Sequence, residues 1–160
     1  MSIPGATVHR HGGNQLTGFN WENNASNAGT DNINSSDSYL GSNAGIGNSQ
    51  TPGAVMQAWV NADRAAGLKA IMTLPLAGYV AADMNGTVSQ GKTAPSARWK
   101  QIVVNKGAPL SVTPNTSDSF VYLDEMVNFL LVKYGSACSS RCKAPLLSRP
   151  RCGQIRILRA

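Results

Sequence analysis

The stretch from His9 to Gly29 constrains the fold more than any other part of this chain. It holds five asparagines, two adjacent glycines, one tryptophan and one glutamate within 21 residues. Gly and Asn are poor helix formers and are also depleted in strands, so neither regular element is predicted here. Asn side chains can bond nearby backbone groups and Gly permits positive φ, so the composition predicts a rigid, irregular loop. Amide groups beside aromatic rings suit a neutral, polyhydroxylated ligand such as a sugar.

The order of residues in this stretch carries a family resemblance. Residues 10–14 read RHGGN, residues 17–24 read TGFNWENN, and residues 26–29 read SNAG. This order closely resembles the start of the catalytic domain of glycoside hydrolase family 44. Further landmarks extend the resemblance over about residues 6–136; they are Leu74–Val80, Arg98–Lys100, Asn105–Gly107 and Tyr134–Gly135.

The resemblance implies a secreted endo-β-1,4-glucanase or xyloglucanase with a (β/α)8 TIM barrel and an attached β-sandwich. It also implies a retaining mechanism that uses two glutamates, the first within an Asp-Asn-Glu-Pro motif after the helix that ends in Tyr-Gly. A whole barrel needs about 250 residues, whereas this chain has 160. We therefore expect an α/β fold made of the N-terminal two to three βα units of an incomplete barrel, with long loops and a disordered or irregular C-terminal tail.

The apolar pattern predicts a βαβ unit near the start of the chain. Residues 6–10 are partly β-branched and predict a first strand. Thr51 and Pro52 predict a helix start, and Gly67 predicts its end. Residues 68–74 form an apolar run that is typical of a buried parallel strand. Strand, helix and strand with short joints make a βαβ unit.

The remaining segments alternate between predicted loops and predicted regular elements. Residues 32–50 and 76–97 predict two long surface loops because they are rich in Asn, Ser, Gly and Asp. Residues 99–105 predict a short strand. A helix is predicted from Ser117 to Gly135, with Asp118 favourable to its dipole. Its apolar stripe consists of Phe120, Leu123, Val127, Leu130 and Tyr134.

Charge divides the chain near Ala137. The net charge is +6, yet residues 1–140 carry eight basic and eight acidic side chains, and the last 20 residues carry six basic and no acidic ones. All three cysteines, Cys138, Cys142 and Cys152, also lie beyond Ala137. We predict a partial family 44 barrel over residues 1–137 and a basic tail unrelated to the family over residues 138–160.

The basic tail, the histidines and the cysteines bear on possible partners and cofactors. The tail could bind nucleic acid or an anionic surface, but it lacks interleaved aromatic residues, so no specific nucleic-acid partner is expected. His9, His11 and the cysteines could suggest zinc, but three and nine residues between cysteines match no common site. We expect no metal and no other cofactor. No apolar run is long enough to span a membrane, and Met1–Pro4 lacks signal-peptide features, so localisation is assigned only to the family, as secreted.

Candidate substrate-binding residues come from the loops that follow the first two strands, because such loops build barrel active sites. Amide, guanidinium and hydroxyl groups could bond sugar hydroxyls, Trp21 could stack on a sugar ring, and Glu22 could bind or brace. The candidates are Arg10, Asn14, Asn20, Trp21, Glu22 and Tyr79. The structural alternative is loop bracing for the polar residues and a loop core for Trp21. Trp59 is predicted to be a core residue, and Trp99 is left open.

Catalysis by this chain is not expected. Retaining glycosidases need two carboxyl groups about 5 Å apart, and the chain contains only two glutamates, Glu22 and Glu125. Glu22 does not match a catalytic motif position of the family, and Glu125 is predicted to lie on the exposed side of its helix. Two alternatives remain: a non-catalytic remnant that binds carbohydrate, and an unstable truncated product with no function.

The compositional break leads to the hypothesis of a frameshift or a gene truncation near codon 137. Translation of the underlying DNA in the two other frames is expected to reveal an Asp-Asn-Glu-Pro-like segment. Its absence from both frames would remove the hypothesis.

Overall fold

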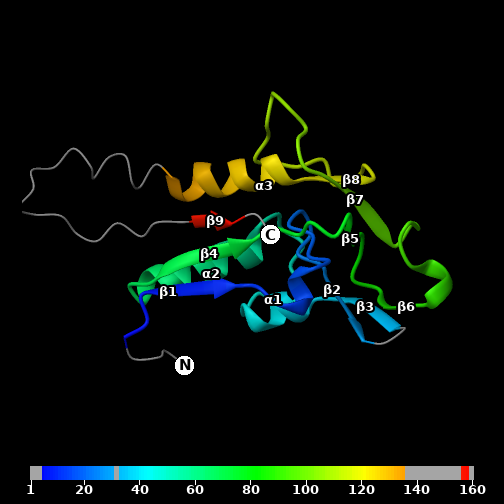
Figure 1. Cartoon of the computed structure of the whole chain (residues 1–160), viewed down its shortest axis with the longest axis horizontal. Helices are drawn as coiled ribbons and strands as arrows, with labels where there is room; N and C mark the ends of the chain where they lie inside the picture. The colour runs from blue at the N-terminus through cyan, green and yellow to red at the C-terminus, as the bar shows by residue number, and fades with distance from the viewer. Residues whose placement is uncertain (1–4, 31–32, 136–155, 159–160) are drawn as a thin grey trace, which may run out of the picture.

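Three small sheets organise the chain in the computed structural model, which describes residues 5–30, 33–135 and 156–158 (Figure 1). The strands are β1 (Val8–His11), β2 (Ser26–Thr30), β3 (Ile33–Asp37), β4 (Lys69–Thr73), β5 (Tyr79–Ala81), β6 (Gly86–Val88), β7 (Trp99–Val103), β8 (Phe120–Tyr122) and β9 (Arg156–Leu158). The helices are α1 (Tyr39–Asn43), α2 (Ala54–Ala65) and α3 (Leu123–Leu130), with short turns η1 (Asn14–Leu16), η2 (Gln90–Lys92) and η3 (Leu131–Gly135). The strand orders are β1-β4-β9, β2-β3-β6 and β5-β7-β8. Within these ranges, no helix has both the length and the apolar character needed to cross a membrane.

The first sheet confirms the predicted βαβ unit. Strands β1 and β4 run parallel, with Val8 opposite Lys69 and His11 opposite Met72. Helix α2 connects them and packs against β4. Both arrows in Figure 1 point toward the region of β2 and β5, so the loops after these strands gather at one end of the sheet. This end is where ligands bind in parallel α/β folds.

The start of α2 differs from the prediction. The helix begins at Ala54 rather than at Pro52, and its N-cap is Gly53, which has φ 71°. Thr51 does not cap the helix with its side chain. Instead, the Asn24 side-chain oxygen accepts the N–H of Val55 at 3.1 Å, across 31 residues of sequence. A cap supplied from a distant loop satisfies the same free N–H groups as a local one, but sequence spacing does not reveal it.

The end of α2 was predicted correctly. Gly67 has φ 73° and donates its N–H to the Arg64 carbonyl at 3.1 Å. Leu68 donates to the Asp63 carbonyl at 2.8 Å. This pair of bonds is a Schellman motif, in which Gly accepts the left-handed conformation at little cost.

The predicted loop over residues 32–50 was wrong, as was the absence of strands from the opening stretch. Strands β2 and β3 form an antiparallel hairpin, and α1 follows them. Polar side chains replace the usual apolar pairs: Ser26 donates to Asp37 Oδ1 at 2.7 Å, and Asn27 donates to Ser36 Oγ at 3.2 Å. Cross-strand hydrogen bonds of this kind stabilise a ladder whose residues have poor strand propensity.

The predicted loop over residues 76–97 also contains strands. Strand β5 pairs antiparallel with β7, and β6 pairs antiparallel with β3. Strands β5 and β6 have three residues each, which is too few for an alternating apolar pattern to be recognised in the sequence. Their strand conformation depends on pairing with β7 and β3. The strand predicted over residues 99–105 is confirmed as β7.

The last helix begins later than predicted. Residues 120–122 form β8, parallel to β7, and α3 starts only at Leu123. Ser117 therefore does not cap it, and Asp118 accepts the N–H of Phe120 rather than facing the helix dipole. The aromatic and β-branched sequence Phe-Val-Tyr favours a strand, although its spacing also fits a helical stripe.

The tail was predicted to be disordered or irregular over residues 138–160. The structure corrects this at residues 156–158, which form β9 along the free edge of β4 in parallel register. An unpaired strand edge presents a row of backbone donors and acceptors that another strand can occupy. The break near Ala137 and the rest of the tail lie outside the described residues.

Gly53 and Gly67 have similar φ values, 71° and 73°, but different surroundings, so together they test this packing. An added Cβ at Gly53 would lie 2.3 Å from a ring carbon of Phe129 on α3, whereas nothing lies within 4 Å of one at Gly67. Gly67→Ala should cost about 1–2 kcal/mol, the strain of a left-handed L-residue. Gly53→Ala should cost about 1–3 kcal/mol more, because overpacking adds to the strain. Urea unfolding measures both; equal costs would contradict the packing of α3 on the start of α2.

Candidate functional site

An open pocket of about 260 Å³ lies beyond the carboxyl ends of β1 and β4. Its lining comes from the loops after these strands and from the two other sheets. The lining residues are Asn14, Thr17, Gly18, Asn27, Ala77, Tyr79, Thr93, Ala94 and Trp99. Asn14 is exposed on η1, Tyr79 is half-buried on β5, and Trp99 is half-buried at the start of β7. The pocket thus combines residues that lie up to 85 positions apart in the sequence.

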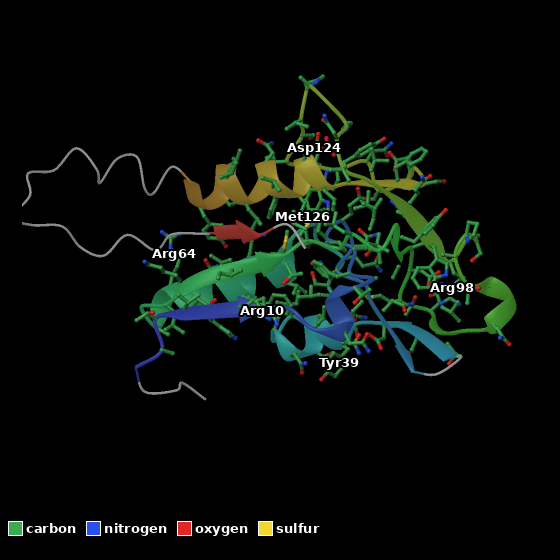
Figure 2. All side chains as sticks on the ribbon, in the orientation of Figure 1. Arg10, Tyr39, Arg64, Arg98, Asp124 and Met126 are labelled. Carbon is green, nitrogen blue, oxygen red and sulfur yellow. The ribbon has the colours of Figure 1, made fainter. Side chains whose placement is uncertain are left out.

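Two of the six predicted binding residues, Asn14 and Tyr79, meet in this pocket. Arg10 does not line it, but Arg10 is exposed, and an added Cβ on Gly12 would lie 2.3 Å from its guanidinium nitrogen. The Arg10 side chain therefore covers Gly12 at the end of β1. In Figure 2 the labelled Arg10 lies on β1, well separated from Arg98 beside the third sheet.

Trp21 is corrected from a candidate stacking residue to a core residue. Its exposed fraction is 0%, and its ring contacts that of Phe129 with 5.4 Å between centroids. A ring enclosed on all sides offers no face to a sugar. The structure shows the alternative, a loop-core tryptophan, because Trp21 contacts Phe129 of α3 and its carbonyl accepts the N–H of Gly53 at the start of α2 at 2.7 Å.

Asn20 is likewise corrected from a binding residue to a bracing residue. It is fully buried, and its side-chain amide donates to the Ala81 carbonyl at 2.9 Å. Its side-chain oxygen accepts the N–H of Glu22 at 2.9 Å. The neighbouring Asn23 donates to the Ala82 carbonyl at 2.9 Å, so both amides hold β5 against the opening stretch.

Glu22 also braces the loop rather than facing the pocket. Its side chain is 1% exposed, and one carboxylate oxygen accepts from the Lys100 ammonium at 2.9 Å. Lys100 also donates to the Thr116 carbonyl at 3.0 Å. Burial raises the pKa of the Glu22 carboxyl, and the Lys100 ammonium offsets part of this rise. The ion pair therefore joins the opening stretch, β7 and the segment before β8.

Glu125 was expected on the helix surface and is instead fully buried. Its Oε1 accepts from the Lys106 ammonium at 2.7 Å and from the N–H of Ser111 at 3.0 Å. The prediction failed because the long loop before β8 covers the face of α3 that carries Glu125. The sequence pattern did not indicate this loop contact. Glu125 thus holds that loop onto α3.

Sequence reasoning missed three kinds of pocket residue. Asn27 lies in the hairpin that was predicted as loop, Thr17 lies in the quoted motif over residues 17–24 but was not singled out, and Thr93 lies in a turn with no distinctive motif. Trp99 was left open and is now placed in the pocket, where its Nε1–H donates to the Lys92 carbonyl at 3.0 Å. Its position as the aromatic residue within the family landmark Arg98–Lys100 was the signal that could have drawn attention to it.

The lining offers amide, hydroxyl and aromatic groups. The described residues that form it include no aspartate and no glutamate. Such a surface can bond and stack on a neutral polyol, but it cannot supply a carboxyl pair for acid–base chemistry.

A cluster of three ionisable side chains, His9, His11 and Asp63, lies between β1 and α2, away from the pocket. His9 and His11 approach the Asp63 carboxylate at 2.8 and 2.7 Å. The His11 ring also stacks on Trp59, with 4.7 Å between centroids and 4° between planes. Trp59 is half-buried against the core, in keeping with its prediction. Burial lowers the pKa of His11, and the Asp63 hydrogen bond offsets part of the effect.

Removal of the lysine from the buried pair tests the role of Glu22. Lys100→Met leaves a buried carboxyl without its cation, which should cost about 3–5 kcal/mol of unfolding free energy near neutral pH. The pKa of Glu22, already raised by burial, should rise further without the Lys100 ammonium. Between the pKa of the unfolded chain and this higher value, the Glu22 carboxyl is protonated in the folded state and ionised in the unfolded state. Stability of the variant should therefore fall as pH increases from about 5 to about 8.

The double variant Lys100→Met/Glu22→Leu is the control for this test. It should regain most of the loss, because a buried ion pair replaced by apolar groups is often close to neutral. Urea unfolding at several pH values measures the series. A single variant that costs less than about 1 kcal/mol would contradict the bracing role.

Comparisons with known proteins place the chain in a family. The sequence model of glycoside hydrolase family 44 matches residues 15–146. Endoglucanase A of Paenibacillus lautus is 47% identical over 133 residues, which cover 82% of this chain and 19% of that protein. The β-mannanase/endoglucanase A of Caldicellulosiruptor saccharolyticus is 47% identical over 135 residues, covering 83% of this chain and 10% of that protein.

Solved structures agree with this placement. A family 44 xyloglucanase from Paenibacillus polymyxa superposes with a TM-score of 0.77 at 50% identity, over 81% of this chain and 26% of that one. A structure of the P. polymyxa xyloglucanase with xyloglucan gives 0.78 at 46% identity, over 86% and 28%. The family 44 endoglucanase of Clostridium thermocellum gives 0.78 at 48% identity, over 82% and 26%. The chain spans about a quarter of these structures and a fifth or less of the curated relatives. On the family match and these likenesses together, this chain belongs to glycoside hydrolase family 44.

Proposed function

We propose that this chain forms the first βα units of a β-1,4-glucan-hydrolysing (β/α)8 barrel and supplies one wall of its substrate cleft, without the catalytic groups. The parallel β1-α2-β4 unit and the parallel pair β7-β8 followed by α3 support the barrel part of the proposal. The pocket beyond the ends of β1 and β4 supports the cleft part, because barrel active sites are built from the loops at that end.

The chemistry of the pocket is the observation that carries the proposal. Asn14, Asn27 and two threonines offer amide and hydroxyl groups, and Tyr79 and Trp99 offer aromatic rings. A β-glucan presents hydroxyls around the edge of each sugar ring and C–H groups on its faces, so it matches both kinds of group. Relatives whose names include xyloglucanase and endoglucanase point to cellulose-like or xyloglucan chains as the substrate class. Polymers of this size lie outside cells, so the proposal implies extracellular action.

The positions of Glu22 and Glu125 argue against hydrolysis by this chain alone. Both glutamates of the sequence are buried and paired with lysines, Glu22 with Lys100 and Glu125 with Lys106. A retaining glycosidase needs one carboxyl group as nucleophile and another as acid and base, both open to the sugar. Neither glutamate meets this condition. We assign both to folding.

Binding of a soluble glucan tests the wall function. Xyloglucan oligosaccharides, titrated into the full chain by calorimetry, should bind with 1:1 stoichiometry. Trp99→Ala should weaken the affinity by about tenfold, the loss of a stacking contact worth about 1.4 kcal/mol. Tyr39→Ala is the matched control, because Tyr39 is 51% exposed on α1 and is not among the pocket residues. Equal affinities for both variants and the parent would reject the pocket as the binding site.

A reducing-sugar assay on carboxymethyl cellulose tests the second half of the proposal. No sugar release above the blank is expected from the chain on its own. Clear turnover would overturn the assignment of Glu22 and Glu125 to folding while leaving the binding result untouched. A chain that shows neither binding nor a cooperative thermal transition would instead favour the alternative of an unstable product.

A further inference from the structure

The cluster of His9, His11 and Asp63 joins β1 to α2 on the face opposite Arg10. His9 and His11 are two residues apart on β1, so their side chains point to the same face of the strand. Helix α2 covers this face and directs Asp63 between them, although more than 50 residues separate it from both. One ligand-type atom from each residue, a ring nitrogen of each histidine and an Asp63 oxygen, lies within 4.8 Å of the other two.

The cluster has the features of a three-ligand metal centre. Asp63 is 4% and His11 is 8% exposed, so both are fixed by packing, and the stack on Trp59 holds the His11 ring in place. The His9 side chain is 53% exposed, which leaves a path for an ion and a place for a water ligand. Two imidazoles, one carboxylate and one open position match the ligand set of three-ligand zinc sites.

An ion requires the three ligand atoms to adopt tetrahedral spacing. Zinc bonds to nitrogen and oxygen are about 2.0–2.2 Å long, which puts tetrahedral ligand atoms roughly 3.3 Å apart. His9 Nδ1 and His11 Nε2 now lie 2.8 and 2.7 Å from different oxygens of the Asp63 carboxylate. One ligand-type atom from each of the three residues lies within 4.8 Å of the other two, so the side chains must rotate to bring these atoms to the tetrahedral spacing. Rotation of the exposed His9 ring and of the Asp63 carboxylate provides this movement.

We propose that His9 Nδ1, His11 Nε2 and the Asp63 carboxylate bind a Zn²⁺ ion, with water as the fourth ligand. On binding, each coordinating ring nitrogen gives up its hydrogen and the other ring nitrogen carries it, so both imidazoles stay neutral. The ion acts as a clamp between β1 and α2. It takes no part in glucan chemistry, because the pocket lies beyond the end of β1 and includes none of these three residues.

Imidazole ligands select the class of ion. Ca²⁺ and Mg²⁺ prefer cages made of oxygen, whereas Zn²⁺ and its neighbours in the transition series accept imidazole readily. Co²⁺ takes the same geometry and is coloured, so its absorption spectrum reports tetrahedral nitrogen and oxygen ligands directly.

The experiment must first remove a competing site. Cys138, Cys142 and Cys152 carry thiols that bind zinc well. The full chain with all three replaced by serine is therefore the parent, stripped with a chelator and titrated with Zn²⁺ by calorimetry and with Co²⁺ by visible absorption. One ion per chain, with a tetrahedral Co²⁺ spectrum, is expected. The thermal midpoint should rise with the concentration of Zn²⁺, because the ion binds the folded state.

Two substitutions locate the ion. His9→Ala should weaken Zn²⁺ affinity by about 100-fold or more, since loss of a mere supporting contact to a ligand already costs about 10–100-fold. Asp63→Asn should do the same. Asp83→Asn is the matched control, because Asp83 also forms an ion pair, with Arg98 at 2.7 Å, and lies outside the cluster. Its affinity should equal that of the parent.

Three results would overturn the proposal: no saturable binding by the serine parent, an unchanged affinity in His9→Ala, or an equal loss in Asp83→Asn. The first would leave the cluster as a set of hydrogen bonds only. Should Asp63→Asn fail to fold, His9→Ala still decides the matter, because the exposed His9 side chain can be truncated with the circular dichroism spectrum as a check on folding.

Discussion

Side-chain amides in the opening stretch hold the described fold together. The chain between η1 and β2 has no regular ladder to satisfy its own polar groups, and buried groups left unpaired are costly. Asn20 and Asn23 therefore bond the carbonyls around β5, and Asn24 bonds the carbonyls of Ser49 and Thr51 at 3.0 and 2.7 Å. Asn24 also caps α2, and it accepts a positive φ of 62° to do so. One short segment thereby fixes the positions of α2, the loop before it and the sheet that contains β5.

Two buried ion pairs extend this network and show that both glutamates serve the fold. Lys100 joins Glu22 to β7, and Lys106 joins Glu125 to the loop before β8. In both pairs the carboxylate is almost wholly enclosed, so each acid contributes to the fold and neither faces a ligand. The groups left facing the pocket are neutral. These observations support the proposal that this part of the chain holds a substrate without supplying a catalytic carboxyl group.

The sequence predicted those parts of the fold in which local pattern and tertiary structure agree. The βαβ unit, the stop at Gly67 and the strand at Trp99 follow from apolar periodicity and glycine chemistry. The hairpin at Ser26–Asp37 and the short strand at Tyr79 did not, because distant partners rather than propensity stabilise them. Residue type alone could not separate the two positions of asparagine: Asn14 lines the pocket, whereas Asn20 is buried and braces β5.

We propose that a glucan contacts this chain at Trp99 and not at Trp21, the tryptophan of the opening stretch. The sequence has three tryptophans, and their environments differ: Trp21 is buried beside Phe129, Trp59 stacks on His11, and Trp99 lines the pocket. Each indole N–H gives a separate signal in a nitrogen–proton correlation spectrum. Titration with a xyloglucan oligosaccharide should shift the Trp99 signal progressively and leave the other two in place. A shift confined to Trp21, or no shift at all, would contradict the account.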